Sequence, residues 1–462
     1  MAMANEATNQ HLPLAALRQP RRAPSATRVS GLVALAIVGS FASARTAHAV
    51  ETTDVLDAFD DDNNDPFDMA LRVRFQNESR NATIGRETRC LVGDSIGNGL
   101  CSGSGNVYAR ELKYQRSKNT MFVDARFGLY KDLEFYVTFP FVTSDKWQHD
   151  FVDGVDRSNS TIYGQKDSEV LFKVPYNSVA RSGFGDMSFG LKWSPFNYYR
   201  DPTHPTWVFG VELKVPSGQA MKVDNTGVGE GFYDLQLFST ISRRALTIFE
   251  PFFNLHANFR FGSDSGLFKN YGPTQGRDVN PGDQIGSQFG LTIVPWEDVK
   301  ADTRVEIEGG FGMDYIFRGR EYTEIWEALA SADNPCQAAT GCQNTLHTSS
   351  SPGADGKLTQ TDGITTVEPY GRFSGWAAVH YQPIKYFQIS AKVGWMRETA
   401  HFLTFADPGV DLDGKNGVEV KNSNNTNEFS PVYLPSVDTI GQRIRLLDAS
   451  NTLMMISVTG KY

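Results

Sequence analysis

The chain has 462 residues, of which 40% are hydrophobic and 12% aromatic, and its formal net charge is -9. This mild acidity, with no stripe of basic residues, differs from the basic surfaces of nucleic-acid-binding proteins, so no nucleic-acid partner is expected. Its slightly negative mean hydropathy does not exclude a membrane protein, because a transmembrane β-barrel turns only alternate residues toward lipid.

The first 49 residues have the pattern of a secretory signal peptide. Four arginines between positions 18 and 28 precede the apolar run 31–41, and small residues ending in Ala47-His48-Ala49 follow. A membrane anchor is the alternative, but this run is shorter than the ~20 residues that a spanning helix needs. The sequence therefore predicts export, with the mature chain beginning after Ala49.

Residues 50–68 are acidic and rich in turn-forming residues, with four aspartates between positions 60 and 65. A calcium site is the alternative to a linker, but the spacing does not match an EF-hand loop, which needs a glycine and a distal glutamate. We therefore expect a solvated linker over 50–68, followed by one barrel domain over 69–462. No metal ligand, cofactor site or catalytic residue is predicted.

Apolar and polar residues alternate in about twelve segments beyond residue 69. The clearest is GLYKDLEFYVTFPFV, residues 128–142, where Leu133, Phe135 and Val137 alternate with polar residues after the YKD turn. A period of two over this many segments indicates β-strands rather than helices. Within the long link near 319–365, the stretch REYTEIWEALASA predicts a short helix.

The links between these segments alternate in length. Short links such as YKD and QPIK alternate with long ones near 144–182, 262–283, 319–365 and 400–451. Outer-membrane barrels have this pattern, with short periplasmic turns and long extracellular loops. The sequence predicts an all-β fold, a transmembrane antiparallel up-and-down β-barrel of about twelve strands, with fourteen as the alternative.

Three features favour a membrane barrel over a soluble β-sandwich. Full charges occupy the polar face in mid-strand, and aromatic residues such as Trp193, Trp207 and Tyr381 gather near the short turns. The chain also ends on an alternating strand whose last residue is Tyr462, which suits the C-terminal signal read by the barrel-insertion machinery. The expected surroundings are outer-membrane lipid, in the cell outer membrane of a Gram-negative bacterium.

The four cysteines form two close pairs, Cys90 with Cys101 and Cys336 with Cys342. In an exported chain such pairs are typical of disulfides that staple loops. Neither pair has cysteine or histidine neighbours at zinc spacing, and free or metal-bound thiols are the alternative.

Several of these stretches resemble one known family. They are GLYKDLEFYVTFPF and GFGDMSFGLKW (183–193), together with ELKVPSG (212–218) and EPFFNLHANFRF (250–261). The chain resembles, over about 71–462, the outer-membrane transporter-like family named for the MetA pathway of phenol degradation. That resemblance implies a barrel of about a dozen strands that passes small molecules, aromatic ones among them, and it implies no catalytic residues. The long cysteine-containing loops depart from the family pattern.

The polar face of the predicted strands carries both signs of charge in near balance. Such residues either tune the solute selectivity of a pore or form cross-strand ion pairs that stiffen the barrel. The predicted lumen-lining residues are Asp124, Arg126, Glu134, Tyr136, Asp186, Lys192, Glu212, Lys214, Asp234, Arg260, Arg304, Glu306, Glu308, Asp314, Arg372 and Lys392. Inward aromatic residues either form a stacking track for solutes or fill the lumen.

The predicted function is a channel or transporter that passes small solutes, aromatic or hydrophobic molecules being the candidates. A non-conducting structural or adhesive barrel is the alternative. A barrel hydrolase is less favoured, because the histidines on the inward face, His256 and His380, lie in no recognisable catalytic pattern.

Overall fold

A computed structural model describes residues 53–58, 68–90, 105–162, 171–331 apart from 224, 247 and 263–278, and 363–462 apart from 416, 419–427, 429 and 431. All of them belong to one compact unit, Ala44–Tyr462. The predicted signal peptide and both cysteine pairings lie outside the residues and side chains described.

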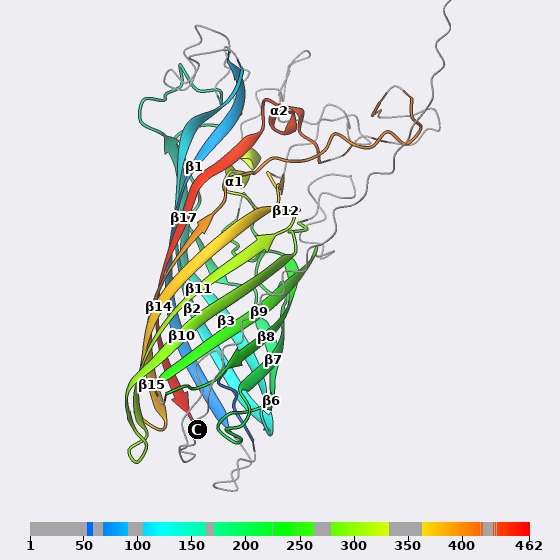
Figure 1. The fold of residues 1–462 in the computed structure, drawn as a ribbon. Helices are drawn as coiled ribbons and strands as arrows, with labels where there is room; N and C mark the ends of the chain where they lie inside the picture. The colour runs from blue at the N-terminus through cyan, green and yellow to red at the C-terminus, as the bar shows by residue number, and fades with distance from the viewer. Residues whose placement is uncertain are drawn as a thin grey trace, which may run out of the picture. The chain divides into compact units, whose positions relative to one another are not determined.

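Within this unit, twelve antiparallel strands form a closed ring (Figure 1). Neighbours along the chain pair with one another, and the last strand pairs with the first from Ala70↔Lys461 to Arg86↔Ile444, which closes the barrel. The strands of the ring are β1 (Met69–Cys90), β2 (Gly105–Tyr130), β3 (Leu133–Phe151), β6 (Ser188–Phe196), β7 (Thr206–Lys214), β8 (Phe232–Ser242), β9 (Phe249–Gly262), β10 (Gln284–Asp298), β11 (Thr303–Ile316), β14 (Tyr370–Ile384), β15 (Phe387–Glu398) and β17 (Ile444–Lys461). The barrel prediction is confirmed with twelve strands rather than fourteen.

The remaining elements are short and lie toward the end of the barrel that carries the long loops, hereafter the long-loop end. They are β4 (Tyr176–Asn177), β5 (Arg181–Phe184), β12 (Gly319–Glu321), β13 (Thr365–Val367), β16 (His401–Phe402), α1 (Trp326–Ala330) and α2 (Pro435–Asp438). The helix expected near 319–365 is α1. No helix among the described residues is long and apolar enough to cross a membrane.

The hairpin turns at the opposite, short-turn end follow from local sequence. Asp132 in the YKD turn and Asp302 between β10 and β11 have φ of 52° and 50°. Aspartate tolerates this left-handed conformation better than most residues, so each strand reverses within a few residues.

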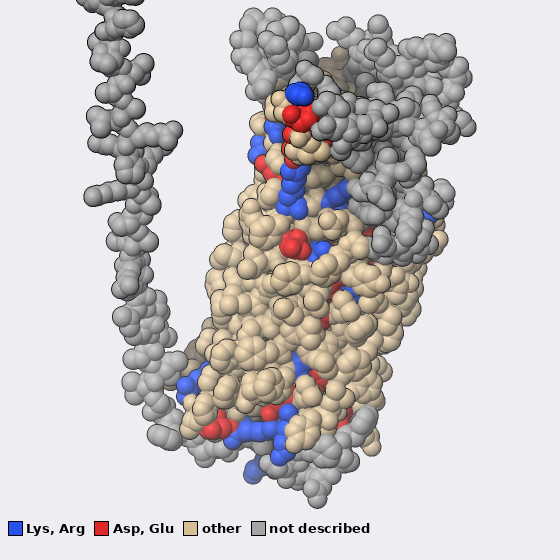
Figure 2. All heavy atoms as spheres, turned by 90° about the vertical axis from the view of Figure 1, so that its right-hand side faces the viewer, with Lys and Arg blue, Asp and Glu red and all other residues tan. Residues whose placement is uncertain are grey.

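An apolar band surrounds the wall. The outward side chains of Leu71, Val73 and Phe75 are 43–49% exposed, whereas the intervening Arg72 and Arg74 face inward. Figure 2 shows one face of this band, where charged residues gather toward the two ends and the middle is mostly uncharged. Trp193, Trp207, Trp296 and Tyr381 are exposed near the short turns, as expected for an interfacial girdle.

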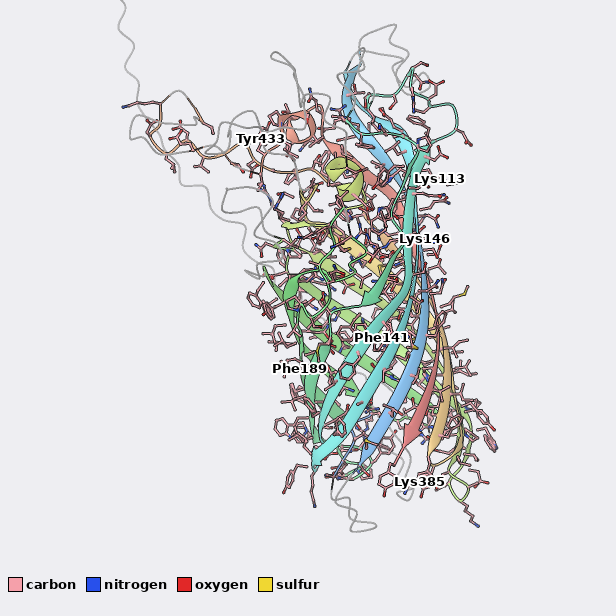
Figure 3. The ribbon with its side chains drawn as sticks, turned by 180° about the vertical axis from the view of Figure 1, so that it is seen from behind. Lys113, Phe141, Lys146, Phe189, Lys385 and Tyr433 are labelled. Carbon is pink, nitrogen blue, oxygen red and sulfur yellow. The ribbon has the colours of Figure 1, made fainter. Side chains whose placement is uncertain are left out.

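Above the band, β1, β2, β3 and β17 continue as a polar extension. Outward residues on β1 change from Phe75 to Asn77, whose side-chain amide donates to Asn119 of β2 at 2.7 Å. Figure 3 shows the same change along the wall, with Phe141 at mid-height and Lys146 and Lys113 closer to the long-loop end. These strands therefore extend beyond the apolar band.

The inner face of this extension supports a hydrophobic cluster, which we name the cap. Its largest fully buried members include Leu112 of β2, Phe172 of the β3–β4 loop, and Ile325 and Leu329 at α1. β3 and β11 are six places apart in a ring of twelve, so they lie on opposite walls. The segment after β11 carries Trp326 to within 6.1 Å of the Trp147 ring on β3, and the cap therefore crosses the mouth of the barrel.

Val137 faces outward in the middle of β3. Placing arginine there should destabilise the barrel folded in a bilayer by about 2–4 kcal/mol, because a charge near the midplane meets hydrocarbon. Gln148→Arg on the polar extension of the same strand is the matched control and should change the stability little. Urea titration in lipid vesicles measures both, and an equal effect at the two sites would contradict the orientation of β3.

Candidate functional site: the barrel lumen

The predicted lumen-lining residues of the ring strands lie on the inward parity, where most of them pair with one another or with neighbours. At the short-turn end, Arg126 donates to Glu134 through Nε at 2.9 Å and through a terminal nitrogen at 2.6 Å. Lys192 lies 3.4 Å from the same carboxylate. Glu134 is fully buried, so this group is a compact ion-pair cluster rather than an open ring of charge.

The segment 53–58 occupies the same end of the lumen. Its Asp54 pairs with Arg126 at 3.1 Å, and the Leu56 amide donates to Glu134 at 2.8 Å. Thr53 is hydrogen-bonded to Ser242 of β8 at 2.9 Å. These residues therefore do not form the solvated linker that the acidic composition predicted. They contact strands from β2 to β8 because their carboxylates and amides find charged partners on the inner wall.

The same segment is also held at the turn between β6 and β7. Arg200 of that turn pairs with Asp57 and, at 2.6 Å, with Asp132 of the β2–β3 turn. A side chain on Gly128 would lie 2.8 Å from the backbone of Asp57 and Ala58, so the wall is shaped to accept this backbone. We name residues 53–58 the plug.

Ion pairs continue up the lumen. Asp124 accepts from Arg72 of β1 at 2.8 Å, Arg260 lies 3.3 Å from Asp234, and Arg304 lies 2.6 Å from Glu306. Asp186 differs from the other predicted residues, because it lies in the link before β6 and accepts from the backbone amides of Gly218 and Glu230. Asp186 therefore fixes a loop, whereas the predicted residues on the strands form ion pairs between neighbouring strands of the wall.

Inward glycines hold the aromatic rings against the wall. A Cβ on Gly210 would lie 2.0 Å from the Phe238 ring, and one on Gly310 would lie 2.2 Å from the Trp376 ring. Tyr136 covers Gly190 and Phe252 covers Gly290 in the same way. Each ring therefore lies flat over a neighbouring strand. The rings occupy the space where a glycine has no side chain, so they do not need to project toward the barrel axis.

These rings are surrounded by charged and polar groups. Tyr136 donates its hydroxyl hydrogen to Glu212 at 2.6 Å, and Lys192 lies 5.2 Å from the centre of its ring. Trp376 donates to Glu308 at 2.6 Å, and Lys392 lies 5.0 Å from its ring. The aromatic surface of the lumen is thus polar at its edges and carries cations on its faces.

Sequence reasoning missed several inward charges on β1, β2, β3, β9 and β15. They are Arg72, Arg74, Glu78, Arg80, Arg116, Lys118, Asp145, Glu250 and Glu398. The signal was available on β1, since Arg72, Arg74 and Arg80 alternate with the outward apolar set that begins at Leu71. Glu398 lies at the end of β15, beyond the apolar residues that marked the strand.

Two inward-facing histidines of the barrel wall lie beside acids, an arrangement not recognised from the sequence. His256 contacts Asp314 at 2.9 Å through Nε2 and Asn254 at 3.1 Å through Nδ1, over Gly286. Both ring nitrogens are engaged, so neither is free to activate a nucleophile.

His380 lies between Ser390, 2.8 Å from Nδ1, and Glu308, 4.0 Å from Nε2. All three side chains are at most 5% exposed. The order Ser390–His380–Glu308 resembles that of a catalytic triad, but a carbonyl substrate could not reach the buried Ser390 hydroxyl. Both histidine arrangements therefore fit a structural role better than a catalytic one.

A cluster of carboxylates in the loop after β16 is the clearest metal-like grouping among the described residues. Oxygens of Asp411, Asp413 and Glu428 lie within 4.8 Å of one another. Each residue accepts a backbone amide of the same loop, as Glu428 does from Leu412 at 2.9 Å. These hydrogen bonds to backbone amides explain why the three carboxylates lie close together, and they indicate a role in shaping the loop.

The cap is fixed by a fully buried ion pair. Arg181 of β5 donates to Glu327 of α1 at 2.6 Å, and both side chains are 0% exposed. The guanidinium carbon also lies 5.3 Å from the Trp147 ring and 5.2 Å from the Trp326 ring. Burial raises the pKa of the Glu327 carboxyl, and Arg181 opposes that shift.

A polar cavity of about 220 Å³ lies under the cap, between the β12–β13 hairpin and the wall. Its charged lining residues are Glu78, Arg80, Arg116, Lys118, Glu321, Glu324, Arg372 and Glu398. Burial raises the pKa of Glu321 to about 7; Arg260 and Arg372 oppose this shift, and Glu324 and Glu398 add to it.

No protein-family model and no curated protein matches the sequence. The structure is similar to the COG4313 outer membrane channel of Pseudomonas putida F1, with a TM-score of 0.38 and 11% identity over 85% of this chain and 95% of that chain. A Pseudomonas aeruginosa FadL homologue has a TM-score of 0.30 and 8% identity, over 86% and 90%. The outer membrane protease OmpT of Escherichia coli has a TM-score of 0.26 and 10% identity, over 86% and 97%. At these identities the similarity concerns the fold alone.

Glu327→Ala should destabilise the cap by about 3–5 kcal/mol, because it leaves Arg181 buried without its counter-charge. The paired change Arg181→Met with Glu327→Leu removes both charges and should cost less, the remaining loss being that of the Arg181 hydrogen bonds to the Lys222 and Gly227 carbonyls. Hydrogen exchange of the α1 amides measures cap opening. Equal losses in the single and double variants would show that the ion pair is not what holds the cap.

Glu321 makes stability depend on pH. Its pKa is about 7 in the folded chain against the ordinary glutamate value of 4.5, so the folded state binds more protons between these values. Unfolding free energy should therefore fall as pH rises from about 4.5 to 7, relative to Glu321→Gln. Urea titrations at pH 5 and pH 8 measure the difference, and a constant offset between the two proteins would contradict the shift.

Proposed function

We propose that this protein is an outer-membrane channel for small polar solutes, whose lumen is closed at the periplasmic end by the plug and at the extracellular end by the cap. The observation that carries the proposal is the set of inward glycines. A barrel that serves only as a scaffold gains stability by filling its interior, because packed side chains add dispersion contacts. Here the β6–β11 wall carries glycine where a side chain would project inward.

The separate origin of the closing segments supports a gated channel. The plug precedes the first strand and the cap is built from loops, so either can move without breaking the closed ladder of strands. The plug is attached by hydrogen bonds and ion pairs to wall residues that keep other partners without it. A closed wall whose two ends are shut by separate segments fits solute passage.

The character of the lining favours polar solutes over the hydrophobic ones that were a candidate from the sequence. The Tyr136 and Trp376 rings are flanked by charged groups, and ion pairs line the wall at several heights. A hydrocarbon would have to desolvate these charges without pairing them. An aromatic molecule that carries polar groups remains compatible with the proposal.

A non-conducting adhesive barrel is the second candidate, and the hydrophobic core of the cap favours it. A well-packed cap on extended strands is suited to present a stable outer surface. The two functions differ in one measurable property, which is whether ions or solutes pass once both the plug and the cap are loosened.

Replacing Asp54 and Asp57 together with alanine, in a protein whose cap is also loosened by Glu327→Ala, should increase single-channel conductance several-fold in planar bilayers. The two changes release the plug, while Arg126 keeps Glu134 and Arg200 keeps Asp132 as partners on the wall. Asp201→Ala, in the exposed β6–β7 turn, is the matched control and should behave as the unaltered protein does. Folded protein without conductance in any variant would favour the adhesive function.

A further inference from the structure

Most of the charged side chains that line the polar cavity under the cap pair with one another or with a neighbour. Arg80 donates to Glu324 at 2.9 Å and to Glu398 at 2.8 Å. Arg372 also reaches Glu398, at 3.2 Å, and Arg116 pairs with both oxygens of Asp145. These side chains form closed networks, in which each cation already has its carboxylate.

Two lining residues stand outside these networks. Within the part of the chain that the structure describes, the side chains of Lys118 and Glu321 form no hydrogen bond and no ion pair with a group of opposite charge. Lys118 lies directly opposite Glu78 in the β1–β2 ladder, but Glu78 accepts from the amide of Gln76 instead. The cavity thus offers one cation and one carboxylate without direct partners.

The two residues are placed by different parts of the structure. Lys118 projects inward from β2, in a ladder that runs without interruption from Asn119 to Tyr114 against β1. Glu321 ends the β12–β13 hairpin, where it pairs with Thr365 across the strands, and neighbouring Arg320 is bridged to Asn280 through the backbone. Both positions are therefore held by backbone hydrogen bonds and not by a salt bridge between the two side chains.

We propose that this cavity binds small zwitterions of the amino-acid type, with the solute carboxylate against Lys118 and the solute ammonium against Glu321. The inference rests on the proposed channel, since the site would hold a solute in transit. One cation and one carboxylate that lack hydrogen-bond and ion-pair partners fit a zwitterion better than a phosphate or a divalent cation, either of which needs several like-signed partners. At roughly 30 Å³ per water, the cavity has room for about seven waters, which suits a small solute.

The protonation of Glu321 supports this assignment. Desolvation disfavours its carboxylate in the empty cavity, and an arriving ammonium group would restore a counter-charge. Arg260 and Arg372 favour the ionised form, while Glu324 and Glu398 oppose it, so these four groups set the balance that the solute shifts. Binding should strengthen between pH 6 and pH 8 as Glu321 ionises.

Calorimetry on the purified full barrel in detergent tests the site, with L-alanine as the probe and propionate and ethylammonium as single-charge comparators. We expect saturable binding of L-alanine, at least tenfold weaker binding of each comparator, and at least a tenfold loss in Lys118→Met and in Glu321→Gln. The gain in affinity with pH should disappear in Glu321→Gln. Lys118→Arg should keep most of the binding because it retains the positive charge.

Lys113→Met is the matched control, because Lys113 lies on the same strand with its side chain exposed on the outer face (Figure 3). It should bind L-alanine as the unaltered protein does, and heat-modified gel mobility checks that every variant is folded. Absence of saturable binding, or equal binding by the folded Lys118 and control variants, would overturn the site. Conductance is measured separately. A barrel that conducts but does not bind L-alanine would support the channel and contradict the site. A barrel that binds L-alanine but never conducts would support the site and contradict the channel.

Discussion

The antiparallel pairing of β1 with β17 is the contact on which the rest of the structure depends. A hydrocarbon layer offers no hydrogen bonds, so a spanning sheet must pair every backbone group within itself. The long β1–β17 ladder removes the two edges that an open sheet would expose. Once the ring is closed, each strand has one face toward lipid and one toward the lumen, and both the apolar band and the inward charges follow from that division.

The lumen combines two ways of using inward positions. On part of the wall, charged side chains pair across neighbouring strands, as Arg126 does with Glu134. On the β6–β11 wall, glycines accept flat aromatic rings from adjacent strands. The first arrangement stiffens the barrel, since each buried charge finds its partner nearby, and the second keeps bulk away from the axis. Together they produce a firm wall with a polar interior, which is a better basis for conduction than a packed core would be.

Closure of the two ends uses different physical means. The plug is polar and is held by groups such as Asp54 and the Leu56 amide, whose partners on the wall can also pair among themselves. The cap is hydrophobic, and the buried ion pair of Arg181 with Glu327 lies between two tryptophan rings. The plug therefore depends mainly on polar contacts, whereas the cap depends on buried apolar area together with a desolvated charge pair.

The sequence by itself determined the barrel, because a period of two and alternating link lengths depend only on local order along the chain. It predicted about twelve strands, with fourteen as the alternative, and it assigned Val137 to the lipid side and Glu134 to the inner side from parity alone. Only the tertiary structure decided which inward charges meet, since Arg80 reaches Glu324 and Glu398 from distant parts of the chain. It also decided that acidic residues 53–58 enter the lumen rather than water, because their partners Arg126 and Arg200 come together only when the ring has closed.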